Sequence, residues 1–388
     1  MKKIAIVSKY MTMGGIEKAL LEMLKLFDKN EFEITLYLSK LGGELYDEIP
    51  NWVNVRLIQD IQFSIKDHFK KNVKNGKPIK AFFKSILLIK NKFESEYYKE
   101  CMHLSNVLPN IKEKYDLVIS YSTPVSLATF YCIYNIDAKK RVAFIHNEVD
   151  KIGTPILPCN EIYSQYDKIF VVSSVAKRKF LTYFPDLNEK TDIFFNIINK
   201  ESIKKLADQG EHFERKNDEI IILTVGRLSY EKGHDIIPKV AYRLKQKNYN
   251  FKWYIIGKGD MDYALEKQIE KLNVENNVIL LGEKKNPYGF FEDCDIYIQT
   301  SRQEGYGITV AEAKCFYKPI ISTEFAGIYD QIEDGKNGLI VPFDEEELEI
   351  AIEEIIGNNY IREKFRKELI MENIDTGYQM NKIFELLG

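Results

Sequence analysis

The stretch DIYIQTSRQEGYGITVAEAKCFYKPIISTE, residues 295–324, contains an apolar strand, a glycine-containing loop, a helical segment and a second apolar strand. The helical pattern begins near Gly307 and ends before Pro319. Short apolar runs separated by helices are typical of a parallel sheet that is covered by helices on both faces. The stretch therefore predicts an α/β fold in which a polar loop follows the carboxyl end of a strand.

The same alternation extends along the chain in two series. The expected strands of the first series are 3–8, 33–38, 116–122, 141–146, 168–173 and 192–197. Those of the second series are 220–226, 252–257, 278–282, 295–301, 318–324 and 338–342. A chain of 388 residues also exceeds the ~100–200 residues of one domain. We therefore expect two Rossmann-like domains that face a cleft, with ligands beyond the carboxyl ends of the strands.

The domain boundaries follow from a polar stretch, ADQGEHFERKNDE at 207–219, that separates the two series. We expect a first domain at 1–198, a linker at 199–218 and a second domain at 219–365. The last helical segment, 366–388, has no strand after it.

The composition is that of an ordinary globular protein, with 45% hydrophobic and 29% charged residues and a net charge of -3. This balance offers no general reason to bind nucleic acid. The five cysteines include no Cys-x-x-Cys pair, which favours buried, reduced thiols in a cytosolic protein over a zinc site or a disulfide frame. No window approaches the ~20 apolar residues of a membrane span, and the apolar N-terminal run is too short for a signal peptide. We expect a cytoplasmic protein.

One loop of the second series combines glycine with positive charge. TVGRLSYEKGHD, residues 224–235, supplies Gly226, Arg227 and Lys232 directly after a strand. Glycine lets a ligand approach the backbone closely, and the two cations suit a phosphate. The alternative is a solvated loop whose charges have no ligand.

Weaker signals follow other strands. Gly257, in a Gly-x-Gly turn, and Gly15, before the first helix, offer backbone amides to an anion, although a tight turn explains them equally well. His146 ends a strand; a lone histidine is more often structural, but the expected wall of the cleft favours a ligand contact. Ser173 and Ser174 end another strand of the first series and either contact an acceptor substrate or form a turn.

Two glutamates, Glu304 and Glu312, stand eight positions apart. On one continuous helix they would be ~12 Å apart and rotated by ~80°, so we place Glu304 in the loop and Glu312 on the helix. Carboxylates accept paired hydrogen bonds from the hydroxyl groups of a sugar or a ribose. Together with the cations and amides they indicate a nucleotide-sugar; the alternative is surface charge and a helix-start carboxylate.

Two Asp-x-Asp triplets, Asp260–Asp262 and Asp293–Asp295, are of the kind that holds Mg²⁺ against a diphosphate. The first looks like a helix start, and the second precedes a strand, which is the wrong end for a ligand. We expect no metal and no cofactor besides the nucleotide-sugar substrate.

Together the motifs resemble the retaining glycosyltransferases of family 4, which have the GT-B fold. The similar segments are GGIEKAL (14–20), FIHN (144–147), FFNII (194–198), VGRLSYEKG (225–233), IIGKGD (255–260), SRQEGYGITVAEAKCFYKPII (301–321) and DGKNGLIVP (334–342). The family's Glu-x₇-Glu element corresponds to Glu304 and Glu312.

The resemblance implies a role for each candidate residue. Arg227 and Lys232 would bind the donor diphosphate and stabilise it as leaving group. Glu304 would hold the donor sugar, Glu312 the ribose, and His146 would line the sugar and acceptor. His146, Arg227, Lys232 and Glu304 form the expected catalytic set. Further donor contacts are expected at Gly15, Gly226, Gly257, Gly282, Gly305, Tyr306, Gly307 and Ile308, with the base near 282–285.

The activity implied is a retaining, metal-independent hexosyl transfer from a UDP-sugar, without a protein nucleophile. The first domain would bind the acceptor, the second the nucleotide-sugar, and the final helix would return to the first domain. A GT-B nucleotide-sugar epimerase and a non-catalytic partner subunit are alternatives, although a decayed subunit should have lost Arg227, Lys232 or a glutamate. A glycoside hydrolase is disfavoured because it needs no phosphate cradle.

The segment FSIKDHFKKNVKNGKPIKAFFKSILLIKNKF, residues 63–93, carries nine lysines and one acidic residue. A basic segment interleaved with phenylalanine suits an anionic membrane surface; the alternative is a solvated helix face. We therefore expect a saccharide or lipid-linked acceptor at the cytosolic face of the cell membrane, in capsule, exopolysaccharide or other cell-surface glycan synthesis, and no nucleic acid. The residues assigned to this acceptor or membrane side are Lys70, Lys71, Lys74, Lys80 and Lys84.

Overall fold

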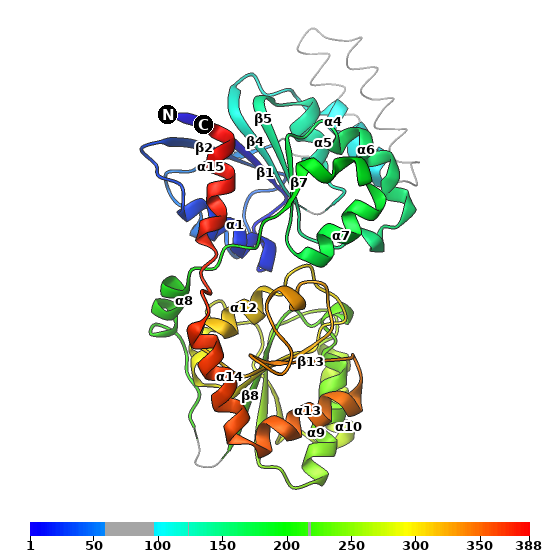
Figure 1. Ribbon diagram of the computed structural model, residues 1–388, viewed down its shortest axis with the longest axis vertical. Helices are drawn as coiled ribbons and strands as arrows, with labels where there is room; N and C mark the ends of the chain where they lie inside the picture. Colours follow the sequence, from blue (N-terminus) through cyan, green and yellow to red (C-terminus); the bar gives the residue numbers. More distant parts are fainter. Residues whose placement is uncertain (59–96, 123, 216–218) are drawn as a thin grey trace. The chain divides into compact units, whose positions relative to one another are not determined.

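The chain forms two compact units, each built on a parallel β-sheet (Figure 1). The computed structural model describes residues 1–58, 97–122, 124–215 and 219–388. The first unit comprises Met1–Ile197 together with Gly377–Gly388, and the second comprises Ile198–Thr376. Helices cover both faces of each sheet. The predicted fold class, α/β with two Rossmann-like domains, is therefore confirmed.

The described residues of the first unit form a seven-stranded sheet in the order β3-β2-β1-β4-β5-β6-β7. Its strands are β1 (Lys2–Ser8), β2 (Phe32–Leu38), β3 (Asn54–Leu57), β4 (Lys114–Ser122), β5 (Asp137–Ile145), β6 (Lys168–Val171) and β7 (Thr191–Ile193). Its described α-helices are α1 (Gly15–Lys25), α4 (Tyr97–Val107), α5 (Leu127–Tyr134), α6 (Asn160–Tyr163), α7 (Ser174–Tyr183) and α15 (Asn381–Leu387). Alternate strand residues enter opposite cores: Ile4 and Ile6 lie in one, Ala5 and Val7 in the other.

In the second unit, the residues that the structure describes form a six-stranded sheet in the order β10-β9-β8-β11-β12-β13. Its strands are β8 (Ile220–Val225), β9 (Phe251–Ile256), β10 (Val278–Leu280), β11 (Ile296–Gln299), β12 (Ile320–Thr323) and β13 (Leu339–Val341). Its α-helices in the described ranges are α8 (Lys200–Ala207), α9 (Ile237–Gln246), α10 (Asp262–Leu272), α11 (Tyr288–Asp293), α12 (Ile308–Cys315), α13 (Glu345–Gly357) and α14 (Asn359–Met371). The chain order therefore reverses between β8 and β11.

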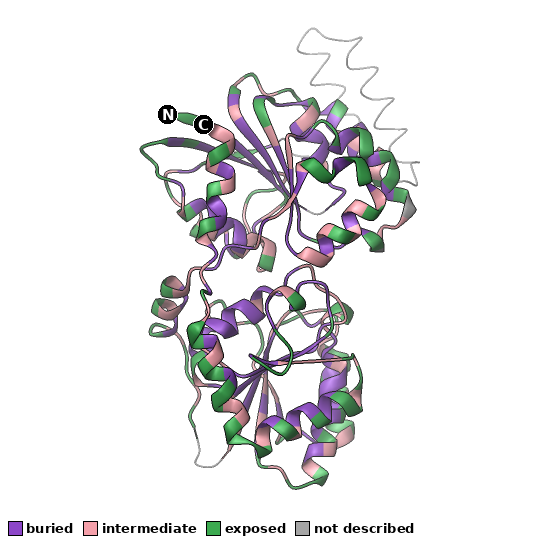
Figure 2. Cartoon of the chain, in the orientation of Figure 1, coloured by how far each residue is buried: buried purple, intermediate pink, exposed green. Residues whose placement is uncertain are grey.

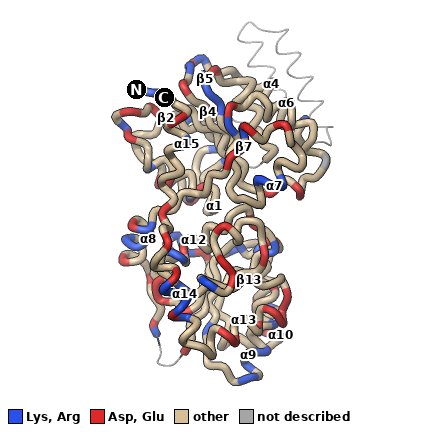
Figure 3. Tube along the Cα trace, in the orientation of Figure 1, with Lys and Arg blue, Asp and Glu red and all other residues tan. Residues whose placement is uncertain are grey.

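Burial explains why the apolar runs were recognisable as strands. In each unit the strands are buried and the outer faces of the helices are exposed (Figure 2). Charged residues of both signs lie on the outer helices of the second unit, whereas its strands carry few (Figure 3). All five cysteines are buried and unbridged, as expected.

The first boundary between the units, at Ile197–Ile198, lies within one residue of the expected one, whereas the expected linker and C-terminal helix differ from the structure. The range 199–218 contains α8, whose first turn is capped by the Asn199 side chain and whose residues Ile203 and Ala207 are buried in the second unit. The polar composition of this range suggested a linker because α8 buries only one narrow face. The expected C-terminal helix, 366–388, is likewise two elements: α14 belongs to the second unit, and α15 belongs to the first.

The short C-terminal helix α15 is anchored in the first unit by packing and by charge. The Phe384 ring stacks on Phe32, with ring centroids 5.5 Å apart, and Ile383 is fully buried. Lys382 forms an ion pair of 2.9 Å with Asp192. These contacts position the chain terminus beside β2 and β7.

Strand β3 was not predicted. Its sequence NVRL is mostly exposed because it lies at the edge of the sheet, where no apolar run is required. The basic segment 63–93, with Lys70, Lys71, Lys74, Lys80 and Lys84, lies outside the described residues. Within those residues, no helix combines the length and apolar character needed to cross a membrane.

Candidate functional site

The carboxyl ends of β8 and β11 form the topological switch point of the second sheet. From here the chain order runs outward in both directions, so the loops that follow the two strands diverge. Ligands of open α/β sheets bind at such points. The loop after β8 contains Arg227 and Lys232, and the loop after β11 contains Glu304.

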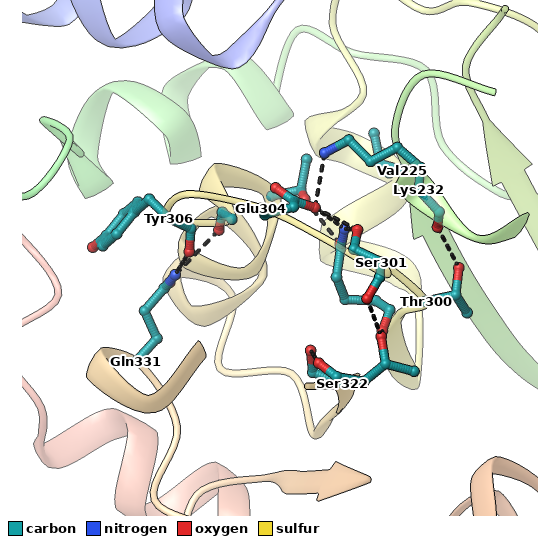
Figure 4. Close-up of polar contacts among 12 residues, drawn as sticks. Val225, Lys232, Thr300, Ser301, Glu304, Tyr306, Ser322 and Gln331 are labelled. Atoms are coloured by element: carbon teal, nitrogen blue, oxygen red, sulfur yellow. Dashed lines mark hydrogen bonds and ion pairs between the residues drawn. The ribbon is translucent and has the colours of Figure 1, made fainter. Parts of the chain in front are cut away.

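The structure brings Lys232 and Glu304 together. The Lys232 Nζ atom lies 2.7 Å from Glu304 Oε1 (Figure 4). The lysine side chain is 24% exposed and the glutamate side chain 10% exposed, so both are largely withdrawn from solvent but still reachable. A cation and a carboxylate therefore lie side by side at the switch point.

Two hydrogen bonds hold the loop that contains Lys232 against the loop that follows β11. The Thr300 hydroxyl donates to the Lys232 carbonyl at 3.0 Å, and Arg302 N donates to the Glu231 carbonyl at 2.8 Å. Gly233 follows with a φ of 65°, and a Cβ atom there would lie 2.0 Å from the Thr300 oxygen. This close approach requires glycine.

A second ion pair strengthens the same junction. The Arg302 guanidinium contacts the Asp235 carboxylate through two hydrogen bonds of 2.6 and 2.7 Å, and it lies over the rings of Tyr230 and Phe343. Such a bidentate pair fixes direction as well as distance. Arg302 was not among the predicted residues, because only the fold brings it to Asp235.

Two buried polar side chains, Gln299 and Ser301, hold the Glu304 carboxylate by hydrogen bonds. Gln299 Nε2 and Ser301 Oγ each donate to Glu304 Oε1 at 2.5 Å. Gln299 is 1% exposed and Ser301 is fully buried. Neither residue was predicted. A glutamine that ends the apolar strand IYIQ is nevertheless a usable signal, because a buried amide needs hydrogen-bond partners.

Three of the predicted glycines, Gly226, Gly257 and Gly282, belong to closely packed backbone near the Lys232–Glu304 pair. Gly226 N donates to the Ile256 carbonyl and Gly257 N to the Gly282 carbonyl, both at 2.9 Å. A Cβ atom at Gly257 would lie 1.8 Å from the Gly226 oxygen. Arg227 is exposed beside these glycines and forms no ion pair with any described residue. An exposed guanidinium next to glycine backbone is a suitable place for an anion.

The loop from Gly305 to Gly307 leads into α12. Gly307 caps the helix with a φ of 82°, and Gln331 Nε2 donates to the carbonyls of Tyr306 and Gly307, the second at 3.3 Å (Figure 4). The side chains of Tyr306 and Ile308 are buried, so a ligand contact there would use backbone.

Glu304 lies in the loop and Glu312 lies inside α12, as their spacing predicted. Glu312 is 2% exposed and accepts a hydrogen bond of 2.8 Å from the Tyr288 hydroxyl. Its predicted contact with ribose stays a prediction.

Two further candidates lie in the first unit. Gly15 is the first residue of α1, and the cap residue before it, Gly14, has no side chain to cover the helix N-terminus. His146 follows β5, is buried, and packs against Tyr121 with ring centroids 4.4 Å apart. Ser173 caps α7 by accepting from Ala176 N at 3.1 Å, which supports the turn-forming alternative for this residue.

The second unit is similar in sequence to known enzymes. Residues 207–370 match the family model "Glycosyl transferases group 1". The uncharacterized glycosyltransferase MJ1059 of Methanocaldococcus jannaschii is 31% identical over 172 residues, which are 44% of this chain and 42% of that protein. A poly(ribitol-phosphate) alpha-N-acetylglucosaminyltransferase of Staphylococcus aureus is 29% identical over 192 residues, 49% of this chain and 38% of that protein. The chain thus spans less than half the length of these two relatives.

The likeness in structure covers the whole chain. HepE of Anabaena, in a crystal structure with UDP, superposes with a TM-score of 0.70 at 18% identity over 100% of this chain and 99% of that one. At this identity the likeness establishes the fold, and the predicted GT-B fold is confirmed. The retaining mechanism, the absence of a metal, the acceptor and the individual site residues stay predictions.

The two Asp-x-Asp triplets have structural partners. Asp293 accepts from Phe213 N at 2.9 Å, Asp295 forms an ion pair with Arg215 at 2.8 Å, and Asp262 accepts from Gly259 N at 2.7 Å. These three carboxylates therefore each fix a loop or a strand end.

A buried histidine of the site was also missed. His234 is 2% exposed, and its ring lies 3.6 Å from the position that a Cβ atom on Gly226 would take. Burial, together with the charge of Lys232, lowers the pKa of His234 to about 3. The ring is therefore uncharged at neutral pH and packs against Gly226.

We expect His146 to make the stability of the first unit depend on pH. Burial lowers its pKa to about 3, an effect that the Asn196 side chain partly opposes, whereas the unfolded value is 6.5. Between these values the unfolded chain binds a proton that the folded chain does not, so stability falls as pH drops below 6.5. His146→Phe should remove a slope of up to about 1.4 kcal/mol per pH unit.

The measurement is urea unfolding between pH 6.5 and about 5, where few carboxylates titrate. The chain has two tryptophans, so Trp253→Phe leaves Trp52 as a fluorescent reporter of the first unit. Parallel pH curves for the His146 variant and its parent would contradict a neutral, buried His146.

Proposed function

We propose that this protein is a retaining glycosyltransferase that transfers a sugar from a nucleotide-diphosphate sugar, in particular a UDP-sugar, without a metal. The observation that carries the proposal is the Lys232–Glu304 pair at the switch point, within the segment that matches group 1 glycosyltransferases. HepE, which has the same fold, was crystallised with UDP, which supports UDP as the nucleotide.

The proposed chemistry follows from charge. As the bond between sugar and phosphate breaks, the diphosphate gains negative charge and the sugar becomes electron-poor. Arg227 and Lys232 would stabilise the departing diphosphate, and preorganised charges of this kind are among the largest contributions to catalysis. Glu304 would hold hydroxyl groups of the donor sugar, and His146, from the first unit, would line the sugar and acceptor.

The acceptor is proposed to be a saccharide or a lipid-linked sugar in the synthesis of a cell-surface polysaccharide, reached at the cytosolic face of the membrane. The name of the S. aureus relative, a poly(ribitol-phosphate) alpha-N-acetylglucosaminyltransferase, supports a polymeric acceptor. The lysine-rich segment 63–93 supports a peripheral contact with anionic lipid.

The first test is a thermal-shift screen with nucleoside diphosphates and their sugars in the presence of a chelator. A ligand at about 100 times its Kd should raise the melting temperature by about 5–10 °C. We expect one nucleotide to be selective and Arg227→Ala to abolish its shift, because the exposed guanidinium has no other partner among the described residues.

Arg366→Ala is the matched control, since Arg366 is a surface arginine of the same unit, 3.9 Å from Glu363. It should keep the full shift. A shift that needs added Mg²⁺ would refute the metal-free mechanism. No shift with any nucleotide would refute the donor assignment.

A further inference from the structure

A buried amide lies directly beneath the Lys232–Glu304 pair. Gln299 ends β11, and its side chain makes four hydrogen bonds. Its Oε1 atom accepts from the Tyr297 hydroxyl at 2.5 Å and from the Thr309 hydroxyl at 2.9 Å. Its Nε2 atom donates to Ser301 Oγ at 2.8 Å and to Glu304 Oε1 at 2.5 Å.

This network allows one orientation of the amide. An ionised carboxylate only accepts hydrogen bonds, so a reversed Gln299 amide would set its own oxygen against Glu304. Burial raises the pKa of Tyr297 well above its ordinary value, so the phenol keeps the proton that it donates to Gln299. Ser301, which accepts from Gln299, is left to donate its own proton to Glu304.

The consequence is an asymmetric carboxylate. Glu304 Oε1 accepts from three donors, namely Lys232, Gln299 and Ser301. In the described part of the chain, no donor contacts Glu304 Oε2. One oxygen is thus saturated by the protein, and the other keeps its full capacity to accept.

We propose that Gln299 is a positioning residue for sugar recognition: it holds Glu304 through Oε1 and thereby presents Oε2 to hydroxyl groups of the donor sugar. This inference rests on the proposed function. The Lys232 ammonium group donates one of its three hydrogens to Glu304, and the other two can donate to an anionic oxygen of the ligand. The preformed pair therefore fits a ligand in which a hydroxyl group lies close to a phosphate oxygen, as in a sugar 1-phosphate.

This arrangement separates the two halves of the donor. A nucleoside diphosphate offers phosphate oxygens to the cations but has no sugar hydroxyl for Glu304 Oε2. The nucleotide-sugar uses both. Loss of the Gln299 amide should therefore weaken binding of the nucleotide-sugar and leave binding of the nucleotide almost unchanged.

The test is Gln299→Met, which keeps the length of the side chain and removes its hydrogen bonds. Calorimetric titrations with UDP, UDP-glucose and UDP-N-acetylglucosamine should show about tenfold weaker binding of the preferred sugar nucleotide. The Kd for UDP should change by less than about twofold. Thr224→Val is the control for the loss of a buried polar side chain in the same sheet. The Thr224 hydroxyl donates to the Ile298 carbonyl, accepts from Trp253 Nε1 and does not contact Glu304.

A second variant, Gln299→Glu, tests the positioning role through the pH dependence of UDP-sugar binding, which a purely structural role of Gln299 would not change. In Gln299→Glu, the protonated acid still donates to Glu304, and its ionised form repels it. The loss of UDP-sugar binding relative to the wild type should therefore be small in acidic buffer and large in alkaline buffer, while UDP binding follows the wild type. This variant also serves if the methionine variant does not fold.

The outcomes are distinct. Equal weakening for UDP and the UDP-sugar, or no weakening at all, would overturn the positioning role while leaving the proposed function in place. A wild-type protein that binds none of the three probes would overturn both. Selective weakening of the sugar nucleotide, with a pH-dependent glutamate variant, supports the assignment.

Discussion

Lys232→Ala is expected to lower the rate of UDP release from the preferred UDP-sugar by about 10²–10³-fold, the usual effect of removing one preorganised charge from a leaving-group site. The folded structure should tolerate the change, because the Lys232 side chain is partly exposed. Glu304 keeps two of its three anchoring donors, Gln299 and Ser301, so the carboxylate should stay in place. The loss would then report on the missing positive charge.

The control for this experiment is Lys239→Ala. Lys239 also forms an ion pair, 2.6 Å from Glu345, but it lies on the exposed side of α9 in the same unit. Exposed pairs contribute at most about 1 kcal/mol to stability, so neither activity nor melting temperature should change much. A Lys232 variant that retains more than about a tenth of the wild-type rate would contradict the role of this lysine.

Gly233→Ala is expected to destabilise the second unit by about 3 kcal/mol or more and to abolish binding of the UDP-sugar. The added Cβ atom would lie 2.0 Å from the Thr300 oxygen and 2.5 Å from the Phe343 ring. The clashing oxygen belongs to the backbone of Thr300, which lies between β11 and Glu304. This backbone cannot move away from residue 233 without separating Lys232 from Glu304.

Gly335→Ala is the control that distinguishes the steric clash at Gly233 from the cost of a positive φ angle alone. Gly335 has a φ of 70°, close to that of Gly233, but a Cβ atom there meets nothing within 4 Å. It should cost only about 1–2 kcal/mol and leave ligand binding intact. Urea unfolding in a Trp52→Phe background follows Trp253, which is buried in the second unit. Equal losses for the two glycine variants would show that the close approach at Gly233 does not matter.

Much of the fold was predictable because buried parallel strands are continuous apolar runs. The runs around Ile4, Leu117 and Ile222 each became a central strand, and these three residues are fully buried. The edge strand β3 and the amphipathic α8 were missed for the complementary reason: an element that buries one narrow face leaves a weak signal in composition. The division of the C-terminal segment between two units also left no local signal.

The candidate site was predictable as a set of residue types and only partly as an arrangement. Helical geometry alone separated Glu304 from Glu312. It did not show that Glu304 contacts Lys232, a residue in another loop, or that Glu312 is buried against Tyr288. These are contacts between segments far apart in sequence, and no periodicity encodes them.

The amino-acid sequence by itself determined the two parallel sheets, the order of their strands along the chain and the loops that carry glycine, cations and carboxylates. Those features depend on local periodicity and on the conformational freedom of glycine. Only the tertiary structure decided which polar groups meet. Strands β8 and β11 are adjacent although their first residues, Ile220 and Ile296, are 76 positions apart in the sequence. This pairing brings Lys232 next to Glu304, which in turn contacts Gln299. The physical reason is that the buried Gln299 amide and the largely buried Glu304 carboxylate need donors and acceptors, and only the packed sheet brings these within hydrogen-bonding distance.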